Sequence, residues 1–421
     1  MKERLKAPEL RFPGFTDDWV QRKLGDLIEE KWIVRQSDGN HGNLYPRSEE
    51  FVDNGVPYVA ASNISSDGNS IDFSTVKYLP QRRADLFKKG VAFDGDILLA
   101  HNATVGPVLR LHTSFDKVIL STTLTLYRVD SEKIDPDFFL QNLRSSMFQN
   151  QLFETMKQST RNQVPILAQQ KLSISITSNL DEQERIGKLL TLLDDLIATN
   201  QRKLDLLKEQ KKGYLQKMFP KNGAKVPELR FAGFADDWEE RKLKELGDIQ
   251  TGNTPPTSDS DNYSLDGVLW VTPTDIKSLV ISNTAKKLSQ VGVTKARIAK
   301  AGSILVTSIA SIGKNTLLRM DAGFNQQINS LTPTSENDSY FLLTQSEKWS
   351  EKMKQTAASA TMQIVNKTEF SNISTYVPVH KEEQQKVGSF FKQLDNNIAL
   401  QQKKISLLKD QKKGLLQKMF I

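Results

Sequence analysis

Residues 8–24 read PELRFPGFTDDWVQRKL, and residues 227–243 read PELRFAGFADDWEERKL. The second copy of this lead segment begins at 227 against 8, an offset of 219. A tail segment, LLKEQKKGYLQKMF at residues 206–219, returns as LLKDQKKGLLQKMF at residues 407–420, an offset of 201. The two offsets differ by 18 residues. A constant frame therefore surrounds a cassette that has changed, which predicts two different binding modules held in one geometry.

Length and composition are those of a globular protein with more than one domain. The 421 residues divide into halves of about 200, with 25% charged and 38% hydrophobic residues. The absence of cysteine excludes disulfides, thiolate zinc sites and cysteine nucleophiles, and suits a reducing, cytoplasmic location. No apolar run is long enough for a membrane span, and the first residues do not resemble a secretory leader. The net charge of +7 permits a nucleic-acid partner without identifying one.

The cassettes combine strand-like and helical patterns. Short apolar runs, broken by Gly, Pro, Asn and Ser, predict strands. These strands cover residues 56–60, 96–100, 121–127, 268–272 and 303–307, and short helices are predicted near residues 138–144 and 340–354. The fold class is therefore α+β, with irregular and curved sheets.

Each half ends in a long proline-free stretch with apolar residues at the a and d positions of a heptad, which is typical of a coiled-coil seam. Asn200 matches Gln401 and Lys211 matches Lys412 in this register, and such polar layers fix register at some cost in stability. The predicted helix-pairing residues are Ile186, Leu190, Leu193, Ile197, Leu204, Leu207, Val387, Phe391, Leu394, Ile398, Ile405 and Leu408.

The connection between the two helices predicts that they pair antiparallel. About 38 helical residues make a rod of about 57 Å, and a second rod must return along the first if the two are to pair. The cassettes would then lie at opposite ends, related by a pseudo-two-fold axis. Because one turn of B-DNA measures about 34 Å, the rod resembles a ruler between two sites on one duplex. The alternative is two surface helices, each packed on its own domain.

Catalytic signatures are absent from the sequence. There is no P-loop and no GxGxxG motif, and His41, His101, His112 and His380 lack the spacing of metal ligands. The loop Thr254-Pro-Pro-Thr257 lacks the acidic or amide residue and the aromatic residue of an amino-methyltransferase motif. We therefore expect no catalytic residue and no metal site in this chain.

Matched small-polar loops in the two cassettes are the candidate DNA-binding sites. Their Asn, Gln, Arg, Ser and Thr side chains are those that contact base edges and phosphates, although the same residues also cap and bend turns. The repeated lysines of the helices form either a solvated face or a surface for phosphate or an acidic partner. The candidate residues are Ser62, Asn63, His101, Asn102, Thr104, Arg161, Asn162, Gln163, Thr274, Asp275, Lys277, Ser308, Ser311, Lys314, Gln363 and Asn366.

The whole pattern resembles the specificity subunit of Type I restriction–modification systems. The resemblance rests on the lead and tail segments, the strands that begin Gly95-Asp-Ile-Leu98 and Gly302-Ser-Ile-Leu305, and the helix openings Glu182-Gln-Glu-Arg-Ile-Gly187 and Glu383-Gln-Gln-Lys-Val-Gly388. It covers nearly the whole chain and is strong in the constant regions and weak in the cassettes. Ser303 departs from Asp96 in the paired strands, a change that a variable domain tolerates.

The resemblance implies target recognition domains at residues 1–155 and 223–356. It also implies conserved regions at residues 156–222 and 357–421, with spacer helices at about 181–219 and 382–420. Each recognition domain would read one half of a bipartite, asymmetric DNA site, and the helices would set the gap and dock two modification subunits. S-adenosylmethionine, ATP and Mg would belong to the modification and restriction subunits, and this chain would bind no cofactor.

Two other classes of function stay open on the sequence alone. A stand-alone nuclease or methyltransferase is disfavoured by the missing motifs. A coiled-coil scaffold, or a DNA-binding protein without sequence readout, would show no sequence preference. The bases read, the gap length, the contacting residues and the solubility of the chain without its partners are not encoded in any recognisable motif.

Overall fold

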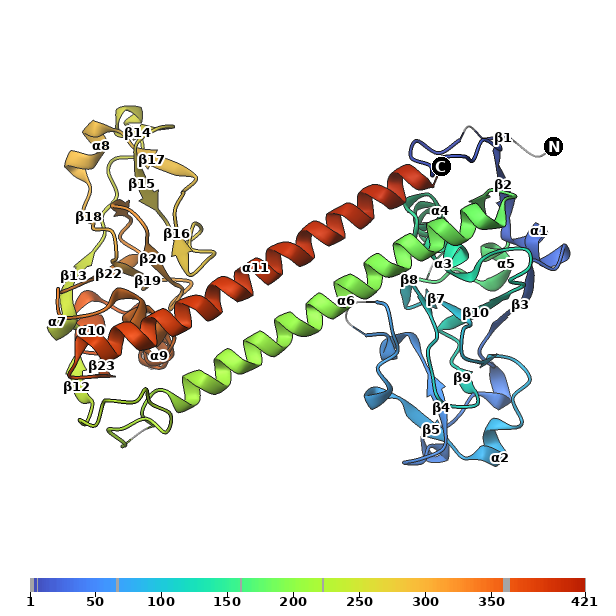
Figure 1. Ribbon diagram of the computed structural model, residues 1–421, viewed down its shortest axis with the longest axis horizontal. Helices are drawn as coiled ribbons and strands as arrows, with labels where there is room; N and C mark the ends of the chain where they lie inside the picture. The colour runs from blue at the N-terminus through green and yellow to red at the C-terminus, as the bar shows by residue number, and fades with distance from the viewer. Residues whose placement is uncertain are drawn as a thin grey trace. The chain divides into compact units, whose positions relative to one another are not determined.

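The chain folds into two compact units, and each takes residues from both halves of the sequence. Unit 1 comprises Met1–Arg202 with Gln402–Ile421, and unit 2 comprises Lys203–Gln401. The computed structural model describes residues 4–5, 7–65, 68–159, 161–221, 223–358 and 364–420 (Figure 1). No helix in these ranges is both long enough and apolar enough to cross a membrane. The predicted α+β class is confirmed in both units.

Unit 1 contains three sheets. A small sheet has the order β1 (Arg4–Leu5), β2 (Trp19–Lys23), β11 (Ser173–Ile176). The second has the order β3 (Ile33–Asp38), β10 (Leu124–Val129), β7 (Ile97–Asn102), β8 (Thr104–Arg110), and the third β5 (Lys77–Leu79), β4 (Val56–Val59), β9 (Val118–Leu120), β6 (Val91–Ala92). The helices are α1 (Leu24–Glu29), α2 (Gln81–Ala84), α3 (Pro136–Arg144), α4 (Ser146–Lys157), α5 (Ile166–Gln169) and the first part of α6 (Leu180–Lys217).

Unit 2 repeats this plan. A two-stranded sheet pairs β12 (Glu239–Lys242) with β23 (Ser374–Val377). The second sheet has the order β13 (Gly247–Thr251), β22 (Ile328–Pro333), β19 (Ile304–Thr307), β20 (Asn315–Leu318), β16 (Val280–Ile281). The third has the order β14 (Tyr263–Ser264), β17 (Lys286–Leu288), β15 (Val268–Val271), β21 (Ala322–Phe324), β18 (Ile298–Ala299). The helices are α7 (Leu243–Leu246), α8 (Gln290–Lys295), α9 (Ser339–Ala358), α10 (Lys367–Ser371) and the first part of α11 (Lys381–Met419).

The two cassettes share one topology although their sequences differ. The order β3-β10-β7-β8 matches β13-β22-β19-β20, and β5-β4-β9-β6 matches β17-β15-β21-β18. The strand pairs β4–β9 and β15–β21 are both parallel. The predicted strands and short helices all appear, and the long helices begin and end within two residues of the predicted limits. The four predicted domain ranges stay a prediction, because the compact units divide the chain differently.

Within each unit the start of one long helix packs against the end of the other. In unit 1, Ile186 and Leu190 of α6 are buried in one core with Met419 and Phe420 of α11. In unit 2, Tyr214 and Phe219 of the α6 end contact Phe390 and Phe391 near the α11 start. Early residues of one helix thus meet late residues of the other, so the helices pack antiparallel inside each unit. The predicted pairing residues are buried or half-buried, including Leu193, Ile197, Leu204, Leu207, Val387, Leu394, Ile398, Ile405 and Leu408.

The tail segments close the cores of the units. Phe420 packs against Trp19 and Phe138 in unit 1, with ring centroids 6.1 and 5.4 Å apart. Phe219 packs against Trp238 and Phe341 in unit 2, at 5.8 and 5.7 Å. A backbone bond accompanies each contact, from the N–H of Leu10 to the carbonyl of Lys418 and from the N–H of Leu229 to the carbonyl of Lys217. Each lead segment is therefore held by the tail segment of the other copy of the repeat.

A buried ion pair fixes each lead segment to the start of the long helix of its unit. Arg11 donates two hydrogen bonds to Glu182, of 2.5 and 2.8 Å, and Arg230 donates two to Glu383, of 2.7 and 2.8 Å. Glu182 and Glu383 are almost fully buried. Because a buried carboxylate is costly unless it is paired, these matched arginines fix the position of each lead segment.

A second matched ion pair joins the two long helices. Lys412 contacts Asp194 at 2.5 Å in unit 1, and Lys211 contacts Asp395 at 2.7 Å in unit 2. Asp194 also accepts hydrogen bonds from Arg144 and Gln141, both at distances of 2.8–2.9 Å. Asp194 is therefore more extensively paired than Asp395, which also accepts a hydrogen bond from the hydroxyl of Tyr340 at 3.0 Å.

We predict that the substitution Phe420→Ala destabilises unit 1 by about 3–5 kcal/mol, because it empties a buried aromatic cluster. The measurement is chemical denaturation of the full-length variant. Leu407→Ala on the same helix is the control, since Leu407 is 58% exposed and its loss should cost little. Equal effects of the two substitutions would contradict the role of the tail in closing the core.

The helix-joining ion pairs predict unequal responses to the loss of lysine. Lys412→Met leaves Asp194 with Arg144 and Gln141, so we expect a small change in the free energy of unfolding. Among the described residues, Lys211→Met leaves Asp395 with one neutral donor, the hydroxyl of Tyr340, so we expect the free energy of unfolding to fall by about 3 kcal/mol.

The pH dependence of unfolding provides a second measurement on the same variants. Burial lowers the pKa of Lys412 from its ordinary value of 10.5, so the folded state gives up this proton before the unfolded state does. Stability from this group therefore rises with pH between the folded pKa and 10.5, and Lys412→Met should abolish that rise. A larger loss for Lys412→Met than for Lys211→Met would refute the assignment of partners.

Candidate functional site

Two of the candidate segments in unit 1 meet at the tip of the β7–β8 hairpin. The N–H of Ala103 donates to the carbonyl of Asn162 at 2.9 Å, and the N–H of Val164 donates to the carbonyl of His101 at 2.8 Å. Asn102 and Gln163 form a β-bridge. We call residues 101–104 and 161–164 the tip cluster of unit 1. Segments about 60 residues apart in sequence thus form one surface.

The same arrangement occurs in unit 2. The N–H of Val365 donates to the carbonyl of Ser308 at 3.0 Å, and Ile309 bridges Ile364. We call residues 308–314 and 364–366 the tip cluster of unit 2. The two clusters occupy the same place in the matched sheets, after β7 and after β19. The structure therefore brings together the pairs of loops that the sequence singled out in each half.

Both hairpin tips turn on a residue with left-handed backbone geometry. Ala103 and Ala310 each have a φ of 63°, which costs free energy for a residue with a Cβ. Ala310 lies 207 residues after Ala103. The second copy is therefore twelve residues shorter than the first between the lead segment and the tip (219 against 207), and six residues shorter between the tip and the tail segment (207 against 201). The same strained turn in two unlike cassettes indicates that the tip conformation has been retained through changes in loop length.

A third segment links each tip cluster to the second sheet of its cassette, and the sequence analysis missed it. In unit 1 the carbonyl of Thr123 accepts from the N–H of His101, and its hydroxyl accepts from the N–H of Ala61. In unit 2 the carbonyl of Gln327 accepts from the N–H of Ser308, while the N–H of Asn325 donates to Val271. Thr123 lies inside the predicted strand 121–127, and no element was predicted at residues 325–327, so only the long-range hydrogen bonds show the role of these segments.

Some of the candidate side chains after β4 and β15 are exposed to solvent, and others are hydrogen-bonded within the protein. Ser62, Thr274 and Lys277 are exposed. Asn63 is buried, and its amide bonds Ala60 and Thr75. Asp275 accepts from Thr272 at 2.9 Å and from Ala285 at 3.1 Å. Asn63 and Asp275 therefore act as turn-forming residues in this structure, beside neighbours that face solvent.

The tip-cluster candidates also divide into buried and exposed side chains. His101 is buried with its Nδ1 3.2 Å from the carbonyl of Val164, and burial lowers the pKa of the imidazole, which favours its neutral form. Ser308 is buried and donates to Gln327. Thr104, Arg161, Asn162 and Lys314 are exposed, whereas Asn102, Gln163 and Ser311 are half-buried. Asn366 is exposed and caps α10 through the N–H of Glu369. Gln363 lies outside the described residues.

A cation–aromatic set recurs in both cassettes and was missed by the sequence analysis. Lys77 lies 5.1 Å from the ring centroid of Phe51, which packs on Tyr58 at 5.5 Å. In unit 2, Lys286 lies 5.8 Å from the centroid of Tyr263, which packs on Trp270 at 6.4 Å. The sequence signal is an aromatic pair seven residues apart followed by a lysine, which is too common a pattern to stand out.

The departure at Ser303 is explained by a paired change. Asp96 accepts two hydrogen bonds from Arg128 on the neighbouring strand β10, of 2.7 and 2.6 Å. In unit 2 the matched contact joins the hydroxyls of Ser303 and Thr332 at 2.8 Å. Both members of the ion pair differ in unit 2, where a neutral hydrogen bond takes its place. No buried charge is therefore left without a partner at this position.

The exposed side chains of the tip clusters are of the types that contact polar partners. Amide, hydroxyl and cationic side chains stand exposed around a rigid turn in each unit, and such groups bind base edges and phosphates. Across the described ranges, no three His, Asp or Glu side chains gather as a metal-binding group. The candidate site is therefore a pair of matched, non-identical binding surfaces.

Comparison with known proteins agrees with this duplicated architecture. A family described as "Type I restriction modification DNA specificity domain" matches residues 16–209 and again residues 235–410. The chain is 22% identical to the putative type I restriction enzyme MjaX specificity subunit of Methanocaldococcus jannaschii, over 99% of this chain and 95% of that protein. It is 23% identical to the HindI specificity subunit of Haemophilus influenzae, over 93% and 97%.

The fold is also that of a solved structure. The crystal structure of the Type-I restriction-modification system S subunit from M. genitalium superposes with a TM-score of 0.68, covering 99% of each chain at 16% identity. Each of the two family matches begins inside a lead segment, spans the cassette and ends inside the long helix that follows it. This chain belongs to the Type I restriction–modification DNA specificity family.

Proposed function

We propose that this chain is the specificity subunit of a Type I restriction–modification complex and reads a bipartite, asymmetric DNA site. The observation that carries the proposal is the recurrence of one tip geometry with different exposed side chains, Thr104, Arg161 and Asn162 in unit 1 against Lys314 and Asn366 in unit 2. A shared scaffold with unlike contact residues is what two readers of unlike half-sites require. Each unit would contact one half-site, and the unlike side chains make the site non-palindromic.

The role of the long helices follows from their continuity between units. Helix α6 begins in unit 1 and ends in unit 2, and α11 runs back from unit 2 to unit 1. A continuous helix is the stiffest connection that a chain can form, so the unread gap between half-sites would be set by helix length. The exposed faces of these helices would dock two modification subunits, and through them the restriction subunits, in the cytoplasm.

We propose that this chain is itself non-catalytic. The modification subunits would carry S-adenosylmethionine, the restriction subunits would use ATP and Mg, and this chain would bind no cofactor. The exposed residues of the tip clusters would supply base contacts, while lysines elsewhere would supply sequence-independent phosphate contacts. The alternative function, a coiled-coil scaffold or a DNA-binding protein without readout, predicts binding that weakens with salt but has no preferred sequence.

The decisive experiment selects binding sites from random duplex DNA with the full chain co-purified with its modification subunits. We expect an enriched split sequence with two unlike half-sites and a fixed gap. Flat enrichment would remove the specificity claim and leave the scaffold alternative. A palindromic product would contradict the assignment of unlike half-sites to the two unlike tip clusters.

A matched pair of substitutions tests the tip clusters directly. Arg161→Ala should lower affinity for the selected duplex about 10-fold and relax preference in one half-site, because a lost bidentate base contact costs about 1–3 kcal/mol. Lys314→Ala should act on the other half-site. Lys171→Ala is the control, since Lys171 is exposed outside the tip clusters. Loss of preference in both half-sites from one substitution would contradict the assignment of one unit to each half-site.

A further inference from the structure

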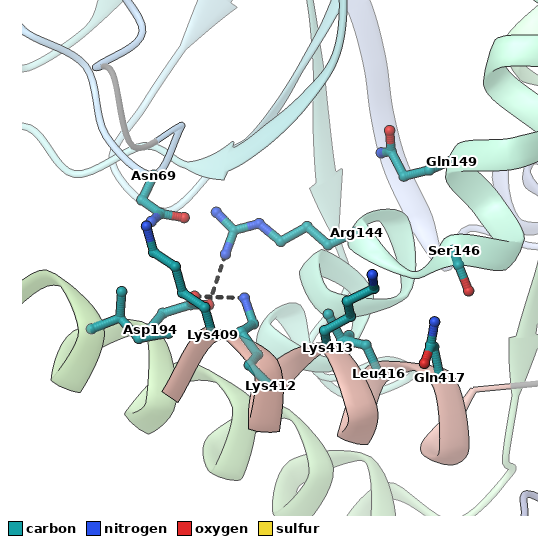
Figure 2. Close-up of a pocket in the computed structure, with 11 residues that line it drawn as sticks. Asn69, Arg144, Ser146, Gln149, Asp194, Lys409, Lys412, Lys413, Leu416 and Gln417 are labelled. Carbon is teal, nitrogen blue, oxygen red and sulfur yellow. Dashed lines mark hydrogen bonds and ion pairs between the residues drawn. The ribbon is translucent and has the colours of Figure 1, made fainter. Parts of the chain in front are cut away.

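A basic groove lies beside the hairpin of unit 1. It encloses about 350 Å³ between helices α3 and α4 and the end of α11 (Figure 2). One wall presents Arg144, Ser146 and Gln149 from the cassette, and the other presents side chains of the tail segment. The tail-segment residues are Lys409, Lys412, Lys413, Leu416 and Gln417.

The charges of this groove do not balance. Four cations line it, and the lining contains a single carboxylate, Asp194. Asp194 is already paired with Arg144 at 2.8 Å and Lys412 at 2.5 Å. Within the described residues, neither Lys409 nor Lys413 forms an ion pair, and both are exposed. Figure 2 shows both lysines projecting from α11 on the side that carries Arg144. The groove therefore attracts an anion.

The cassette wall of the groove is bonded to the hairpin that carries the tip cluster. Arg144 donates to the carbonyl of Val108 at 2.8 Å, and Gln149 donates to the carbonyl of Gly106 at 3.0 Å. Both acceptors lie on β8, which starts at Thr104. Four residues of strand span about 13 Å, so a ligand in the groove lies within a few base-pair steps of one held at the tip.

Unit 2 contains a cavity of about 860 Å³ that shares part of this lining. Its tail-segment wall has Lys212, Leu215 and Gln216, which correspond to Lys413, Leu416 and Gln417 at the offset of 201. Its cassette wall comes from α9 and is bonded to the hairpin by Ser350, whose hydroxyl donates to the carbonyl of Gly313 at 2.7 Å. Its lining carries five lysines against three glutamates, which are Lys212, Lys217, Lys221, Lys348, Lys352, Glu228, Glu347 and Glu351.

The two grooves combine a constant wall with a variable wall. The constant wall supplies the same lysine, leucine and glutamine beside two tip clusters that differ. Contacts that do not change when the reading residues change carry no sequence information, and this is the property of contacts to DNA phosphates. An acidic protein segment would also suit the charge, but it would have no reason to lie at a fixed distance from each tip.

We propose that these two grooves bind the phosphate backbone of the duplex whose half-sites the tip clusters contact. Lys413 in unit 1 and its counterpart Lys212 in unit 2 are the shared phosphate ligands, and Lys409 and Lys217 are a second ligand particular to each groove. The inference rests on the proposed function for the identity of the ligand. The grooves position the duplex so that each tip faces the correct base pairs, and they contribute affinity without preference.

The test compares two doubly substituted full-length chains, each co-purified with the modification subunits. Lys409→Gln with Lys413→Gln removes two charges inside the groove. The control, Lys23→Gln with Lys171→Gln, removes two exposed charges of unit 1 that lie outside the groove and off the long helices. The readout is the dependence of DNA affinity on salt, measured on the selected duplex and on a scrambled duplex.

We expect the groove variant to lose about 1.8 from the slope of log affinity against log salt, at about 0.9 for each phosphate contact. Between 50 and 200 mM salt, the affinity of this variant should therefore fall about 12-fold less than that of the wild type. The effect should be equal on both duplexes, and the selected sequence should stay the same. Lys212→Gln with Lys217→Gln should reproduce the loss of slope, and the four substitutions together should double it.

Three outcomes overturn or separate the claims. A slope equal to that of the control variant overturns the phosphate site. Loss of the modification subunits on co-purification, with the slope unchanged, overturns it in favour of an acidic protein segment. If the groove variant has a reduced slope but the wild-type chain selects no sequence, the phosphate site is supported and the proposed function is refuted.

Discussion

Everything in this structure depends on the closure of each core by a tail segment that belongs to the other half of the repeat. Phe420 completes the aromatic cluster around Trp19, and Phe219 completes the one around Trp238. Unit 1 combines residues 1–202 with the C-terminal residues 402–421, and unit 2 runs from the end of α6 to the first part of α11, so each core is completed by the end of the long helix that begins in the other unit. Within each unit the two long helices run in opposite directions, and their lengths, 38 and 39 residues, are nearly the same although the cassettes differ.

The contacts that hold the frame join repeated residues, and the cassettes supply only auxiliary partners. The pairs Arg11–Glu182 and Arg230–Glu383 use residues found in both copies, as do the pairs between Lys412 and Asp194 and between Lys211 and Asp395. The auxiliary partner of the aspartate varies, from a guanidinium and an amide in unit 1 to a phenol in unit 2. A cassette can therefore diverge without leaving a buried charge of the frame unpaired.

Sequence patterns predicted the limits of the long helices far better than the contacts of the candidate site. The long helices were predicted to within two residues because a heptad pattern sustained over about ten turns has no competing interpretation. The contact between residues 101–104 and 161–164 was not predicted, since hydrogen bonds between distant segments leave no local pattern in the sequence. The segments at Thr123 and Gln327 were missed for the same reason. The burial of Asn63 and Ser308 was invisible because the residue types that cap turns are also the types that contact bases.

The left-handed turns at Ala103 and Ala310 determine how each tip responds to a ligand. Both are held by backbone bonds to a neighbouring loop, and both store strain that other loop conformations would release. A tip of this kind loses little conformational entropy when a partner arrives, because it is ordered beforehand. For the same reason the tip has little freedom to rearrange around a partner of the wrong shape, so a mismatched partner makes fewer contacts with it. A tip preorganised in this way would discriminate between ligands mainly through the rate at which they dissociate.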